Sequence, residues 1–297
     1  MPRCVVAFVL TLAASPLAAQ APAPVPPDTT AAQAPASAAP ETGAAPAAVP
    51  VSATVPAAMT NGAKVWIGKY AEYEEYIKTA PIDHEKDTSV GVLHPKHAFF
   101  TKGGLAEGVV LKNVPTGVRG GFWESYKSEI AAYEMDRLLG LDMVPPTVER
   151  RVHGDLSSVQ LWVNGCKLLK DVDQKQVPHP LEWAKQVCRQ RVFDNLIANI
   201  DRNAGNLLVD DQWNLILIDH SRAFAAEKMP FEKQQTRIDK EFFAKLKALD
   251  EPTLMKHIRP LVLSDSQVRA ILKRRDKIVA DFEQLAQQRG EGAVFPF

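Results

Sequence analysis

The sequence is poor in cysteine and histidine. Its three cysteines cannot form the framework of a disulfide-rich domain, and its seven histidines are scattered without the H-x-x-x-H spacing of a zinc site. The 35 basic and 35 acidic residues balance, which gives no electrostatic reason to expect nucleic acid or an anionic membrane as a partner. No apolar run is long enough to span a bilayer as a helix.

The first residues predict export. Arg3 precedes a short apolar run at 5–14, and Ala19-Gln20-Ala21 fits the small-x-small cleavage pattern, so we interpret 1–21 as a signal peptide and expect a secreted or periplasmic protein. A buried N-terminal helix is the alternative. Residues 22–59 are nearly all Ala, Pro, Val, Ser and Thr, which predicts a disordered tether. Outside the cytoplasm Cys166 and Cys188 could pair.

The remaining chain changes character near its middle. Residues 60–165 are expected to form a β-rich lobe with one long helix, and residues 166–297 a helical lobe, which is an α+β, bilobal layout with a crevice between the lobes. The expected helices are 64–79, 125–139, 181–200, 239–249, 251–258 and 264–288, and the expected strands are 90–93, 98–101, 109–112, 148–152, 159–163, 207–209 and 215–218.

Three polar residues of the second lobe could hold a metal and orient a nucleophile. Asp201 and Asn206 lie in the loop after a predicted helix, in a D-R-x-x-x-N string, and Asp219 ends an apolar strand. Phosphoryl transfer uses one carboxylate to orient the attacking hydroxyl, and a carboxylate with an amide oxygen to hold the metal. We expect Asp201 in the first role, and Asn206 and Asp219 as ligands of magnesium or manganese. The alternative is structural: the same pattern would arise if Asp201 only capped a turn and Asp219 were only the last residue of a strand.

The first lobe supplies residues that could bind phosphate. Gly103-Gly104 is a turn whose backbone could approach a phosphate, and Lys112 ends the next strand, from which its side chain could reach the same phosphates. Glu129, in the first turn of the following helix, could pair with Lys112, reach the metal, or interact with the helix dipole. Trp162 and Val163 close a strand between the lobes, where they could border adenine or belong to the core.

The strings around these residues resemble the atypical kinases of the secretory pathway, the family of the Golgi casein-type kinase and a xylose kinase. The resemblance runs from about residue 91 to 224, and its most specific part is the stretch SEIAAYEMDRLLG at 128–140. It implies a protein-kinase-like fold, ATP as cosubstrate, Lys112 as phosphate clamp and Glu129 as its partner. One departure is that His220-Ser221 follows Asp219, where the family has Asn-Gly or Phe-Gly.

The predicted function is metal-dependent transfer of the ATP γ-phosphate to a hydroxyl of a protein or glycan. Nucleotidyl transfer on the same fold and an inactive, ATP-binding interaction module are the alternatives. Arg222 could orient either Asp219 or Asp201, and His220 is expected to be packed and not catalytic.

Overall fold

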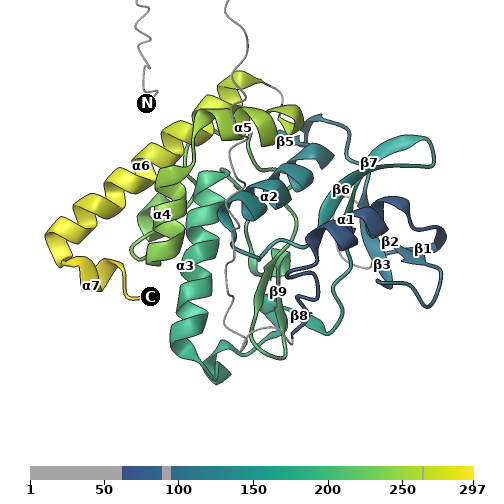
Figure 1. Ribbon diagram of the computed structural model, residues 1–297, viewed down its shortest axis with the longest axis horizontal. Coiled ribbons are helices and arrows are strands. Elements are labelled where there is room, and N and C mark those ends of the chain that lie inside the picture. The colour runs from purple at the N-terminus through teal and green to yellow at the C-terminus, as the bar shows by residue number, and fades with distance from the viewer. Residues whose placement is uncertain (1–61, 89–94, 263) are drawn as a thin grey trace, which may run out of the picture. The chain divides into compact units, whose positions relative to one another are not determined.

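The computed structural model describes residues 62–88, 95–262 and 264–297, which belong to one compact unit (Figure 1). The predicted signal peptide, the predicted tether and the predicted strand 90–93 lie outside these described residues. Within them, no helix is both long and apolar enough to cross a membrane.

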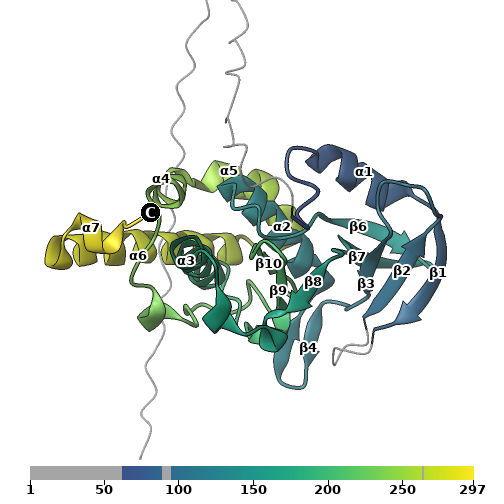
Figure 2. The same ribbon diagram turned by 90° about the horizontal axis from the view of Figure 1, so that it is seen from below.

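A five-stranded antiparallel sheet forms the first lobe, in the order β1-β2-β3-β7-β6 (Figure 2). Its strands are β1 Ile82–Asp87, β2 Lys96–Phe100, β3 Gly108–Lys112, β6 Thr147–Val152 and β7 Asp155–Leu161. Side chains alternate between the two faces of a strand. Val109 and Leu111 therefore point to one face, where they pack with Trp66, Tyr73 and Ile77. Tyr73 and Ile77 belong to helix α1, Tyr70–Thr79, so this helix covers that face, and Lys112 is left on the other.

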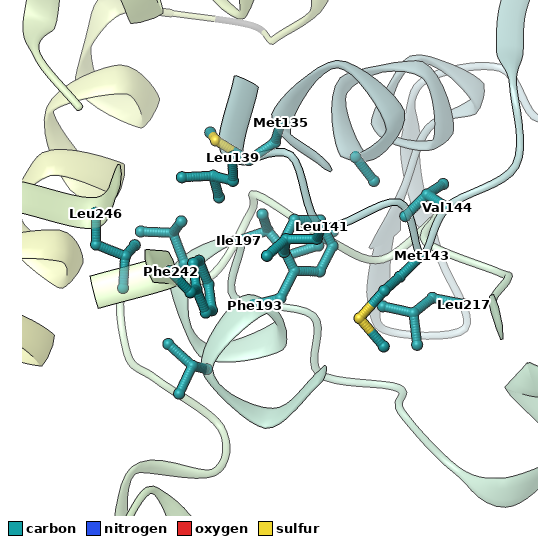
Figure 3. Close-up of a cluster of buried hydrophobic side chains, with 14 of the residues drawn as sticks. Met135, Leu139, Leu141, Met143, Val144, Phe193, Ile197, Leu217, Phe242 and Leu246 are labelled. Carbon is teal, nitrogen blue, oxygen red and sulfur yellow. The ribbon is translucent and has the colours of Figure 1, made fainter. Parts of the chain in front are cut away.

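Helix α2, Tyr126–Leu139, begins and ends where the sequence predicts. Ser125 is its N-cap, and its side chain accepts a hydrogen bond from the Lys127 amide. Gly140 ends it in the left-handed conformation, with φ 57°. Met135 and Leu139 of this helix pack into the core of the second lobe with Phe193 and other apolar side chains (Figure 3). The helix that carries Glu129 is therefore anchored on the helical lobe.

The second lobe combines a small sheet with helices. The sheet has the order β10-β9-β8, with β8 Cys166–Leu168, β9 Leu207–Asp210 and β10 Leu215–Leu217. The helices are α3 Pro180–Leu196, α4 Lys240–Ala248, α5 Glu251–His257, α6 Asp265–Arg289 and α7 Glu291–Val294. The two-stranded hairpin of β4, Gly117–Arg119, and β5, Phe122–Glu124, leads into α2. The predicted α+β layout, with a β-rich first lobe and a helical second lobe, is confirmed.

Several local predictions were wrong. The first helix starts at Tyr70 and not at residue 64, since Gly68 has a φ of 79° and interrupts the chain with a turn. Between the predicted helix 64–79 and the predicted strand 90–93 the chain forms strand β1, which was not predicted because its residues are mostly polar. The hairpin β4–β5 and strand β8 were not predicted. Cys166 and Cys188, which could have formed a disulfide, are both free thiols.

Candidate active site

Lys112 lies at the centre of the candidate site. Its Nζ donates hydrogen bonds to Glu129 Oε1 at 2.5 Å and to Asp219 Oδ1 at 2.9 Å. Burial lowers the pKa of Lys112, but the charges of Asp219 and Glu129 outweigh burial and hold the pKa above its usual range. The lysine is therefore a fixed cation, and it joins the sheet of the first lobe to helix α2 and to the segment after β10.

Both carboxylate oxygens of Glu129 accept hydrogen bonds that hold Lys112 and the segment after β10 in place. The Oε1 atom accepts from Lys112, and Oε2 accepts from the backbone amide of His220 at 2.9 Å. Burial raises the pKa of Glu129, yet the Lys112 charge and the interactions with His220 outweigh it, and the pKa lies below its usual range. Of the roles considered for Glu129, the structure favours partner of Lys112 over metal ligand.

Asp219 and Asn206 lie at the same end of the paired strands β9 and β10, where Leu207 faces Leu217. The Ile218 amide donates to the Asn206 carbonyl at 3.2 Å, directly before Asp219. Asp219 has a positive φ of 61°, and its side chain is 35 % exposed. The Asn206 Nδ2 atom donates to the Asp201 carbonyl at 3.0 Å, which leaves the amide oxygen as an acceptor.

The side-chain oxygen atoms of Asp219 and Asn206 are suitable ligands for a magnesium or manganese ion that also binds phosphate. Among the described residues, no group of three or more His, Cys, Asp or Glu side chains could hold a metal alone. Magnesium commonly binds through one or two carboxylates and completes its shell with waters and substrate phosphates. One carboxylate from Asp219 and one amide oxygen from Asn206 are hard ligands of that kind.

Arg202 organises the loop, and sequence reasoning gave it no role. Its Nε and Nη2 atoms donate to both oxygens of Asp194, at 2.9 and 3.1 Å. Its Nη1 donates to the carbonyls of Asn206 and Ile218, at 2.6 and 2.7 Å, and Nη2 also reaches His220 Nε2 at 2.8 Å. The side chain is 3 % exposed. Arg202 therefore fixes the backbone on both sides of the proposed metal ligands.

Histidine 220 is a packed residue, as predicted. It is completely buried, and burial lowers its pKa. A neutral ring can accept at Nε2 from the Arg202 guanidinium, as the 2.8 Å contact requires. Its backbone amide supports Glu129, so His220 helps to place the Lys112 partner without facing solvent.

Asp201 is the most exposed of the acidic residues gathered here, with 42 % of its side chain exposed. Its Oδ2 accepts from Arg222 Nη1 at 3.1 Å. Of the two possible partners of Arg222, the structure therefore selects Asp201 and not Asp219. The Asp201 carboxylate is thus partly open to solvent.

Gly103 and Gly104 do not join this group. Strand register pairs Phe99 with Gly108 and Lys96 with Leu111, so the glycine turn between β2 and β3 lies at the opposite end of β3 from Lys112. That end is about 13 Å away along the strand. Gly104 packs against Tyr76, whose hydroxyl would clash with any added Cβ. The expectation that this turn and Lys112 approach the same phosphates is therefore wrong.

Trp162 and Val163 lie at that distant end as well. The Trp162 amide donates to the Gly108 carbonyl at 3.0 Å, and its ring stacks on His97, with centroids 3.8 Å apart. Val163 packs against the core of the first lobe. His97 was not predicted to take part, although it faces Val110 of β3 and thus shares the face of the sheet that carries Lys112.

The fold has known relatives among solved structures. No family model and no curated protein match the sequence. A crystal structure of the Golgi casein kinase with Mn/ADP bound is similar, with a TM-score of 0.56 and 17 % identity, over 76 % of this chain and 78 % of the other. The structure of hydra Fam20 with sugar has a TM-score of 0.56 and 15 % identity, over 76 % and 91 % of the two chains. The chain therefore has the bilobal fold of these atypical kinases.

Proposed function

We propose that this protein is a kinase that transfers the γ-phosphate of ATP to a hydroxyl group with the help of a divalent metal ion. The observation that carries the proposal is the position of Lys112 Nζ, 2.5 Å from Glu129 and 2.9 Å from Asp219. Such a lysine, between a helix carboxylate and a metal-binding carboxylate, is the phosphate-binding arrangement of kinases. A lysine that only stabilised the lobe interface would not need a partly exposed second carboxylate.

The other residues have complementary roles in this proposal. Asp219 and Asn206 would hold magnesium or manganese, which neutralises charge on the phosphates when it is bound. Asp201 would accept or orient the proton of the attacking hydroxyl, because its carboxylate is exposed and is held by Arg222. Arg202 would keep both groups in place through its contacts with the loop backbone.

The nucleotide would lie along strand β3. Its phosphates would be near Lys112, and its base would be near Trp162, about 13 Å away along the strand. The aromatic stack of Trp162 on His97 offers an apolar face at that end. Gly103 and Gly104 lie at the end of β3 away from Lys112 and would not contact these phosphates.

The acceptor and the location belong to the same proposal. An acceptor hydroxyl on a protein or a glycan is consistent with an open Asp201, and export is proposed from the apolar run and small residues at 5–21. A similar structure is described with Mn/ADP bound, which supports testing manganese beside magnesium.

The test is a transfer assay with purified protein, manganese or magnesium, and ATP labelled at either the γ or the α position. Label from the γ position in protein or glycan pools is the expected result. Transfer of α label would support nucleotidyl transfer. Binding of ATP without transfer of either label would support an inactive binding module. Asp211→Asn, the same change at an exposed turn residue, is the matched control for Asp201→Asn.

A further inference from the structure

Two residues hold the guanidinium group of Arg222, Glu124 by hydrogen bonds and Phe122 by the contact of its ring. Its Nε and Nη2 atoms both lie 2.8 Å from Glu124 Oε1. The guanidinium carbon lies over the ring of Phe122, 4.5 Å from the ring centroid. These contacts leave Nη1 to donate to Asp201 at 3.1 Å. The direction of that last bond is therefore set by Glu124 and Phe122.

Both of these residues come from the β4–β5 hairpin. Glu124 is the last residue of β5 and pairs with Gly117 of β4, and its side chain is 1 % exposed. The next residue, Ser125, donates its backbone amide to the Ser221 carbonyl at 3.0 Å. The end of the hairpin is thus attached to the segment that carries Arg222.

The burial of Glu124 is costly for the fold. Both donors from Arg222 converge on Oε1, and within the described part of the chain Oε2 has no hydrogen-bond partner. A buried acceptor without a partner lowers stability. Exposed hydrophobic side chains, Val118 and Phe122, lie on the same hairpin. The buried Glu124 carboxylate thus has the Arg222 guanidinium as its charge partner, so the position of one group depends on that of the other.

We propose that Glu124 is a positioning residue for the transfer reaction, acting through Arg222 on the carboxylate of Asp201. The inference rests on the proposed function, since it assigns to the β4–β5 hairpin the task of aiming the group that receives the hydroxyl proton. No bond to Glu124 forms or breaks in the reaction. Its contribution is to hold Asp201 in a productive orientation, which phosphoryl transfer depends on.

The kinetic test compares Glu124→Gln with Glu149→Gln. Glu149 accepts a hydrogen bond from Tyr126 beside the same helix but does not contact Arg222. Glu124→Gln is expected to lower kcat by about 10- to 100-fold while the KM for ATP stays within about twofold, because the phosphate and metal groups are untouched. In an Asp201→Asn background it should have no further effect on kcat. Unchanged kcat in Glu124→Gln, or an equal loss in both backgrounds, would overturn the inference.

A second measurement does not depend on turnover. Unfolding is followed for Glu124→Gln, Asp201→Asn and the double variant, and the same cycle is repeated with Glu149→Gln. We expect the Glu124 and Asp201 losses to be non-additive, because both residues bind one guanidinium, and the Glu149 cycle to be additive. Additive losses in the first cycle would overturn the inference even if the wild type transfers phosphate. Wild-type protein that transfers nothing, with non-additive losses in that cycle, would contradict the proposed function and leave the positioning link intact.

Discussion

Lys112 and Asp219 are 107 positions apart in the sequence, and Nζ of the first donates to Oδ1 of the second at 2.9 Å. The contact joins the end of β3, the central strand of the first lobe, to the segment that follows β10 in the second. Glu129 completes it from helix α2, whose apolar side packs in the core of the second lobe. The charge arrangement of the site is therefore built on three separate elements, and it depends on how the lobes pack.

The first prediction concerns nucleotide affinity. Lys112→Met removes the charge expected to bind phosphate, so ATP with metal should bind about 10- to 100-fold more weakly, as a hydrogen bond to a charged group is worth about 1.5–3 kcal/mol. Isothermal titration calorimetry measures this. Lys69→Met, at an exposed lysine before α1, should bind as the wild type does. Equal affinity of all three proteins would refute the role of Lys112.

Metal binding gives a second prediction. A ligand at about 100 times its dissociation constant stabilises the folded state by about 2.7 kcal/mol, and we expect ATP with metal to do so for the wild type. Asp219→Ala should abolish the part of this gain that requires the metal. Thermal unfolding with ATP alone, metal alone and both separates these parts. Persistence of the full metal-dependent gain in Asp219→Ala would contradict its assignment.

The stability of the loop should depend on Arg202. Arg202→Met leaves Asp194 buried without its charge partner, which costs about 3–5 kcal/mol for a buried pair. Lys247→Met breaks an exposed pair with Glu283 and should cost less than about 1 kcal/mol. Urea denaturation of both variants gives the comparison. Similar small losses in the two would mean that Arg202 does not fix the loop.

The sequence was informative where a local pattern determines structure. The helical spacing of apolar residues over 125–139, ended by Gly140, defined α2 closely. Lys112, Glu129 and Asp219 were selected by type and by position at element ends, and the structure brings these three together. Gly103 and Gly104 were misplaced because the turn lies at the start of β3 and Lys112 at its end, and the antiparallel pairing of β2 with β3 keeps these two ends of the strand apart.

Other parts of the site could not be found without tertiary structure. The contacts of Arg202 with Asp194 and of Arg222 with Glu124 join residues from different elements, and arginines and acids are frequent on surfaces. These contacts matter because they are buried, and burial depends on how the elements pack in the folded protein. The free state of Cys166 and Cys188 likewise depends on distance, which spacing in the sequence does not give.

Buried Asp136 predicts a pH dependence of stability. Burial raises its pKa from 3.8 to about 7, although the Met143 amide donates to its carboxylate at 3.1 Å. The folded chain thus binds this proton more tightly than the unfolded chain does. The proton on Asp136 therefore adds to the free energy of unfolding, and this contribution is complete below pH 3.8. It is lost as the pH rises through about 7, and the total loss is up to about 4 kcal/mol.

Comparison with Asp136→Asn isolates this contribution from those of other groups. Relative to the wild type, the variant should gain unfolding free energy as the pH rises from about 4.5 to about 7.5. Asp276→Asn, the same change at an exposed residue of α6, is the matched control. A constant difference for Asp136→Asn would show that its folded-state pKa is not raised.

The last prediction separates chemistry from binding through Asp201. Its carboxylate is bound by Arg222 and does not contact Lys112, which holds Asp219 and Glu129 instead. Asp201→Asn keeps the size of the side chain and should leave ATP affinity within about twofold. A positioned general base contributes about 10²–10⁴-fold, so kcat should fall by that factor. Asp211→Asn should leave kcat unchanged.

Because the proposed metal ligands are intact in Asp201→Asn, its ATP-dependent stabilisation should match the wild type even when transfer is lost. Transfer at the wild-type rate would show that Asp201 is not the base, and a joint loss of binding and transfer would place Asp201 in the metal site.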